Sequence, residues 1–136
     1  MKKIRSSSLL IGKVIVQELR DIIEVFPIVA PLNTQGNFAV YKRNSLSVEN
    51  TKDIFNYEEN SIYDIVIVTP NYEDGLRLAT NAKMYLERLQ GRYKTSKEEE
   101  IIIGDVAMID ASEEWNNEAY LQKLVFQFKL FNEPDY

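Results

Sequence analysis

The chain of 136 residues carries 45% hydrophobic and 27% charged side chains, the balance of one globular domain with a single core. It contains no cysteine and no histidine, which excludes disulfides, thiolate nucleophiles, sulfur-bound metals and the commonest general base. The formal net charge of -5 argues against a protein that grips nucleic acid by neutralising phosphates, although DNA could still slide past such a surface.

The N-terminal segment begins with basic residues, as a signal peptide does, but polar residues from Lys13 onward interrupt its apolar run at once. No apolar stretch approaches the ~20 residues that are needed to cross a bilayer. We therefore expect a soluble protein that is made in the cytoplasm and has no membrane partner.

Apolar residues recur at spacings of three and four over residues 8–26, which predicts an amphipathic helix. Ser7 or Ser8 can cap its first amides. Pro27 is expected to end this helix, because proline cannot continue the hydrogen-bond ladder and disfavours helical geometry in the residue before it.

The middle of the chain predicts a strand, an arm and a second strand. Residues 38–45 alternate as in a partly exposed strand, and residues 61–69 form the clearest strand, with both faces at least partly covered. Residues 47–60 between them are expected to form a long loop or β-arm. Exposed apolar side chains in that arm would favour a protein partner: Val48, Ile54, Phe55 and Tyr57.

A second helix is predicted after Pro70, with Asn71 as its N-cap and acidic residues in its first turn. Gly91 is its natural end. Its apolar stripe is expected to consist of Leu76, Ala79, Ala82, Leu86 and Leu89.

The last third of the chain predicts two strands. Residues 93–100 form a charged connection, and residues 101–111 a strand. Residues 112–118 are expected to be a polar turn or bulge that contains Trp115, and residues 119–131 the last strand. One face of that strand carries Tyr120, Leu124, Phe126, Phe128 and Leu130, opposite Lys123, Gln127 and Lys129.

These elements predict an α+β fold in which a mostly antiparallel sheet of about four strands has two helices packed on one face. Two amphipathic helices and one apolar sheet face can bury each other in this arrangement. We expect one domain that spans residues 1–136.

No arrangement of residues in the sequence indicates catalysis. The five glycines are scattered and form no phosphate-binding loop. Asp64 with Glu73, or Asp105 with Asp110, could form a carboxylate pair, but surface carboxylates on strands explain them more simply. Basic residues after the second helix are typical of a helix C-terminus. We expect no enzyme activity, no catalytic residues, no cofactor and no metal site.

Several segments, in order, resemble the tail-completion or tail-terminator proteins of tailed phages and prophages. The opening helix followed by VFPIVAP at residues 25–31 is similar to the family's first helix and the segment after it, and FAVYKR at residues 38–43 to its next strand. IYDIVIV at residues 62–68, with Tyr72-Glu73-Asp74, Leu78-Ala79 and Leu86-Glu87, resembles its strand-then-helix unit. Residues 110–114, followed by Tyr120, Leu124 and Phe126, are similar to its closing turn and strand. The chain departs from the family at Asn37, where proline is frequent, and in the run Glu98 to Glu100.

The resemblance implies a non-enzymatic structural subunit of the virion. Such a subunit forms a ring, hexameric or dodecameric, at the phage tail or head-to-tail junction, next to tail-tube, connector or portal-associated proteins. DNA passes through the lumen without specific binding, which an acidic lumen would favour.

Long loops on a compact domain are usually functional or disordered, and we expect the arm and residues 94–100 to supply contact or lumen loops. Deletion of residues 50–57 is expected to leave a folded monomer that no longer assembles. The predicted assembly residues are Val48, Ile54, Phe55, Tyr57, Lys97, Glu98, Glu99, Glu100 and Trp115.

Two alternatives from other functional classes stay open. An enzyme or a nuclease-like accessory factor would use Asp64, Asp105 or Glu113 with a divalent ion, and the metal would stabilise it. A small regulatory or ligand-binding domain would act as a monomer or dimer, with no tendency to form rings.

Overall fold

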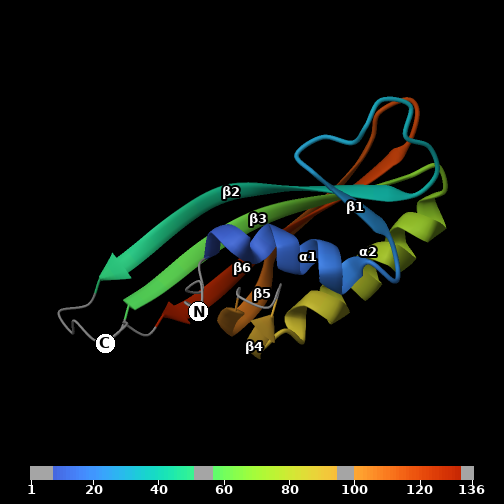
Figure 1. The fold of residues 1–136 in the computed structure, drawn as a ribbon. Coiled ribbons are helices and arrows are strands. Elements are labelled where there is room, and N and C mark those ends of the chain that lie inside the picture. The colour runs from blue at the N-terminus through green and yellow to red at the C-terminus, as the bar shows by residue number, and fades with distance from the viewer. Residues whose placement is uncertain (1–7, 51–56, 95–99, 133–136) are drawn as a thin grey trace.

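Six strands and two α-helices build the part of the chain that the structure describes, residues 8–50, 57–94 and 100–132 of a computed structural model (Figure 1). A short 3-10 helix, η1, precedes the first α-helix. In chain order the elements are η1 (Ser8–Leu10), α1 (Ile11–Leu19), β1 (Glu24–Pro27), β2 (Phe38–Asn50), β3 (Tyr57–Thr69), α2 (Tyr72–Glu87), β4 (Gly91–Lys94), β5 (Glu100–Trp115) and β6 (Tyr120–Asn132).

The strands form one sheet in the order β1-β2-β3-β6-β5-β4. Only β1 and β2 are parallel, and every other neighbouring pair is antiparallel. The predicted α+β fold with a mostly antiparallel sheet is confirmed. The sheet has six strands instead of about four, because two short edge strands, β1 and β4, had been assigned to a helix end and to a charged connection.

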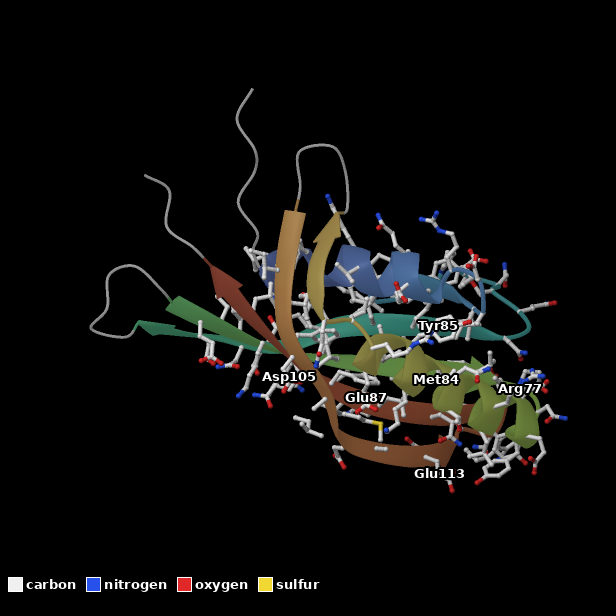
Figure 2. The ribbon with its side chains drawn as sticks, turned by 90° about the horizontal axis from the view of Figure 1, so that it is seen from below. Arg77, Met84, Tyr85, Glu87, Asp105 and Glu113 are labelled. Carbon is white, nitrogen blue, oxygen red and sulfur yellow. The ribbon has the colours of Figure 1, made fainter. Side chains whose placement is uncertain are left out.

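Both helices cover the same face of the sheet, as predicted, and they also contact each other (Figures 1 and 2). Cross-strand pairing places Tyr63, Phe126 and Met108 in one row of that face. Because such partners stand side by side, the two rings and the Met108 side chain can pack against the helices as one layer. The largest fully buried side chains of the core are Tyr63, Phe126, Phe128, Ile11, Ile15, Leu19, Ile65, Ile67, Leu86, Ile101, Ile103 and Leu130.

The first helix is shorter than predicted. It ends at Leu19, whose carbonyl oxygen accepts the N–H groups of both Ile22 and Ile23 in a turn. The chain then forms β1, in which Val25 is buried and pairs with Ala39 of β2. The apolar spacing that continues to residue 26 therefore belongs to a strand. Pro27 ends this strand instead of a helix, and it lies on an edge where a missing N–H is tolerated.

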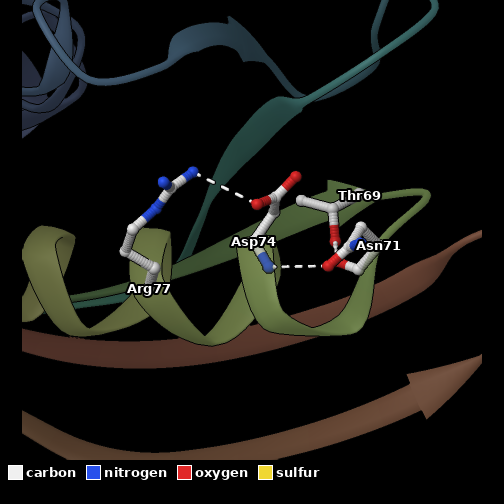
Figure 3. A network of polar contacts seen from close by, with 4 residues as sticks. All are labelled: Thr69, Asn71, Asp74 and Arg77. Atoms are coloured by element: carbon white, nitrogen blue, oxygen red, sulfur yellow. Dashed lines mark hydrogen bonds and ion pairs between the residues drawn. The ribbon is translucent and has the colours of Figure 1, made fainter.

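The second helix begins as predicted (Figure 3). Asn71 is the N-cap, and its Oδ1 accepts the N–H of Asp74 at 3.1 Å. Thr69 Oγ1 donates to the carbonyl oxygen of Asn71 at 2.7 Å, which fixes the entry of the chain into the helix. The predicted stripe is only partly right, because Leu76 is 37% exposed while Leu78 is buried.

The predicted β-arm is present where the structure describes it. β2 and β3 stay paired from Phe38 and Val68 out to Asn50 and Tyr57, and residues 51–56 lie outside the description. The predicted turn over residues 112–118 is too long, since β5 stays paired with β6 as far as Trp115. Residues 112–115 of β5 carry exposed side chains with the composition of a loop, which explains the prediction of a turn there. The turn itself is tight, with Asn117 at a φ of 74°.

Candidate assembly surface

Among the residues that the structure describes, the outermost strands β1 and β4 cover only part of the strands beside them, β2 and β5. β1 pairs with β2 only as far as Tyr41, and β4 pairs with β5 only as far as Ile103. Two stretches therefore have no described strand on their outer side: residues 42–47 of β2, here called the β2 edge, and residues 104–115 of β5, the β5 edge. Unpaired strand edges are the usual places at which proteins add a partner.

The second face of the sheet has no described helix over it. Val66 and Val125 lie on this face and are half-buried by their neighbours, which agrees with the prediction that both faces are at least partly covered. Asp64 is also on this face and is 8% exposed. Its carboxylate accepts from Asn44 Nδ2 at 3.3 Å and lies 3.8 Å from Lys123 Nζ, so a cross-strand network holds it.

An aromatic cluster stands at the end of the β5 edge. The ring of Tyr120 lies 4.6 Å from that of Trp115 and 5.3 Å from that of Tyr72, between centroids. Trp115 is 49% exposed. A partly exposed Trp among tyrosines is typical of protein contact sites, because these rings offer a large contact area at little cost in conformational entropy. The hollow beside them is lined by Tyr72, Glu113, Glu114, Trp115, Tyr120 and Gln122.

Glu113 is the polar centre of this cluster. Its Oε2 accepts hydrogen bonds from Gln122 Nε2 at 2.9 Å and from the Tyr72 hydroxyl at 2.8 Å. The bond from Gln122 and then that from Tyr72 lower the pKa of Glu113, and the same contact raises the pKa of Tyr72. Glu113 is thus held as an anion whose hydrogen bonds come from within the chain.

The carboxylates of the metal-dependent alternative do not come together. Asp105 and Glu113 lie far apart along β5 (Figure 2), and Asp64 points to the opposite face of the sheet from Glu113. Within residues 8–50, 57–94 and 100–132, no three acidic side chains are grouped as they would be around a metal ion. Neither described α-helix has the length and apolar character of a membrane span.

The predicted assembly residues fall at two separate places. Val48, Tyr57 and Glu100 lie in β2, β3 and β5, toward the end of the sheet that carries the arm. Trp115 is at the opposite end of β5, where it pairs with Tyr120. The remaining five, Ile54, Phe55, Lys97, Glu98 and Glu99, lie outside the described residues. The assembly role of the whole set stays a prediction.

One exposed apolar segment was not among the predicted sites. Ile28, Val29 and Leu32 are 70%, 73% and 93% exposed. Ile28 has a φ of 64°, a strained conformation for a β-branched residue, and its N–H donates to the carbonyl oxygen of Tyr41 at 2.7 Å. The available signal is the apolar run over residues 28–32, which follows Pro27, is broken by Pro31 and fits neither strand nor helix periodicity.

Comparison with known proteins shows a likeness in structure but none in sequence. No family model and no curated protein matches the chain. A chain in the solved structure "Virion of native gene transfer agent (GTA) particle" is similar over 92% of this chain and 99% of its own length, with a TM-score of 0.65 and 14% sequence identity. At that identity the likeness establishes a shared fold.

Proposed function

We propose that this protein is a structural subunit of a virion that forms an oligomeric ring at a phage tail or head-to-tail junction. The observation that carries the proposal is the shared fold with a chain of the gene transfer agent virion over nearly the full length of both chains. The sequence resemblance to tail-completion and tail-terminator proteins leads independently to the same class of protein. In this role the ring joins the tail to the connector, contacts neighbouring tail-tube or portal-associated proteins, and lets DNA pass.

The arrangement of the sheet supports ring formation. Its two incompletely paired edges lie on opposite sides of the described structure. A contact that joins two different surfaces of identical subunits is heterologous, and it closes into a ring when the rotation between neighbours allows it. The net charge of -5 also suits a channel for DNA, since surfaces of like charge do not retain the duplex.

The measurement that tests this proposal is the mass of the purified protein, by light scattering after gel filtration over a range of concentration and salt. A species of six or twelve copies is expected. A dimer that stays fixed at all concentrations would contradict the ring and favour the regulatory or ligand-binding alternative. Added divalent metal should not raise the melting temperature, whereas a metal-dependent enzyme would be stabilised.

A further inference from the structure

The two edges carry opposite charge. Lys42 and Arg43 are exposed on the β2 edge, and together with Lys13 they line a second surface hollow, separate from the one at the aromatic cluster. Asp110, Glu113 and Glu114 are exposed on the β5 edge. Charge complementarity of this kind selects which surfaces meet and steers their encounter.

The charged residues also lie at matching heights. Lys42 pairs with Asp64, Asp64 pairs with Val125, and Val125 pairs with Asp110. These side chains share one row across the sheet and point to the face that the helices leave uncovered. When two copies are placed side by side without an axial shift, Lys42 of one copy therefore comes opposite Asp110 of the next.

Exposed apolar side chains accompany the charges on both edges. Ile109 and Trp115 are each 49% exposed on the β5 edge. On the other side, Leu46 is exposed in the β2 edge, and Ile28 lines the hollow that Lys42 and Arg43 share. Apolar groups surrounded by charges have the composition of a protein contact with an apolar centre and a polar rim.

The backbone of the β5 edge is partly blocked. Glu87 Oε2 accepts the N–H of Met108 at 3.2 Å, and Asp110 Oδ1 accepts the N–H of Ala111 at 2.9 Å. These bonds and the two bulges in β5 oppose the extension of the sheet by a continuous ladder. Side chains are therefore the groups that this edge offers to a partner.

The same charges oppose symmetric pairing. Two β5 edges placed together bring acidic groups against acidic groups, and two β2 edges bring basic groups together. Like charges across an interface disfavour both arrangements, while the unlike edges attract. The charges thus disfavour symmetric dimers through two like edges and favour the head-to-tail contact of unlike edges that a ring requires.

From these observations we infer that the partner of the β5 edge is a second copy of this chain. The acidic and apolar β5 edge of one copy lies against the basic β2 edge of the next, with Lys42 beside Asp110. This inference rests on the proposed ring-forming function and identifies the two surfaces that close the ring.

Charge reversal tests the inference in the full-length chain. Variant one is Lys42→Glu/Arg43→Glu, and variant two is Asp110→Lys/Glu114→Lys. Glu113 is left unchanged because it anchors Tyr72 and Gln122. Each variant alone should require at least about tenfold more protein to form rings, since like charges then meet. In an equimolar mixture, the acidic β2 edge of variant one attracts the basic β5 edge of variant two, and the two unchanged edges also attract each other. Rings in which the two variants alternate, with an even number of copies, should therefore return.

A matched control is Arg20→Glu/Arg77→Glu, which changes the net charge as variant one does at two exposed positions away from both edges. It should assemble as the unaltered protein does. Variants that form rings normally on their own would overturn the inference, as would two folded variants whose mixture stays monomeric. An unaltered chain that never forms rings would instead contradict the proposed function.

Thiol cross-linking provides a test that does not depend on how the reversal variants fold. The chain has no native cysteine, so Lys42→Cys/Asp110→Cys places the only two thiols at the proposed contact. A short bismaleimide reagent should give a ladder of covalent species beyond the dimer, up to the copy number of the ring. Arg20→Cys/Arg77→Cys serves as the control and should give none. A double variant that forms rings but yields no ladder would overturn the proposed contact.

Discussion

The two faces of the sheet differ in how they are buried. On the helix-covered face, Tyr63 and Phe128 are almost fully buried and meet edge to face, with ring centroids 5.9 Å apart. On the other face, Val66 and Val125 are half-buried beside the charged pair Asp64 and Lys123. The alternation of side chains along each strand thus provides both a core that stabilises the fold and a surface that can be substituted without unfolding the chain. Assembly can depend on the second face and its edges at little cost in stability.

The largest expected effect comes from Phe126 in the core. Phe126→Ala should lower the free energy of unfolding by about 3–5 kcal/mol, because the side chain is fully buried and leaves a cavity. Its chain neighbour Val125 faces the uncovered side, and Val125→Ala should cost only about 1 kcal/mol. Urea denaturation of both variants measures the difference. Equal losses would contradict the distinction between the two faces.

A smaller effect is expected where α1 touches the sheet. A Cβ added at Gly12 would lie 2.5 Å from Cε2 of the Tyr41 ring, closer than such atoms approach. Gly12→Ala should therefore destabilise the fold by about 1–3 kcal/mol through overpacking. In a Tyr41→Ala background the same substitution should be nearly neutral, which a double-mutant cycle measures. A penalty that persists without the ring would place its cause elsewhere.

The N-cap of α2 should contribute about 1 kcal/mol. Asn71→Ala removes the acceptor of the Asp74 N–H and should lower the stability by that amount. Asn71→Asp keeps an acceptor oxygen and serves as the control. Thermal or urea unfolding compares the two, and an equal loss in both would show that the hydrogen bond is not responsible.

The smallest effect concerns the rim of the covered face. The hydrogen bonds from Gln122 and Tyr72 lower the folded-state pKa of Glu113 below its ordinary 4.5. The stabilisation of the fold by these two hydrogen bonds is thus present above pH 4.5 and is lost as the pH falls through the lowered folded-state pKa of Glu113. Gln122→Met should raise the pKa of Glu113 toward its ordinary value in an NMR titration. Glu113→Gln should lower the pKa of Tyr72, and a Tyr72 pKa that does not move would contradict the contact.

The sequence predicts much of this fold because local signals agree with the final contacts. Alternation identifies β3 and β6, and Asn71 identifies the start of α2. The predicted first helix is too long because its apolar spacing continues into β1, where pairing with β2 outweighs helix periodicity. The four-residue strand β4 is too short to show a pattern.

The candidate surface could be predicted only in part. The sequence predicts Trp115 as an assembly residue, and that role stays a prediction, whereas it does not point to Lys42, Arg43 and Asp110 of the proposed contact. Their relation depends on the strand order, which places β2 and β5 toward opposite edges and Lys42 in one row with Asp110. No local pattern in the sequence contains that information, because the two positions are related only through the pairing of four strands.

The central claim is that copies of this chain close into a ring through which DNA can pass. Electron microscopy of the purified, assembled protein tests it most directly. We expect closed rings of six or twelve copies with a central channel wide enough for a DNA duplex. Compact two-fold dimers or open filaments without a channel would contradict the claim.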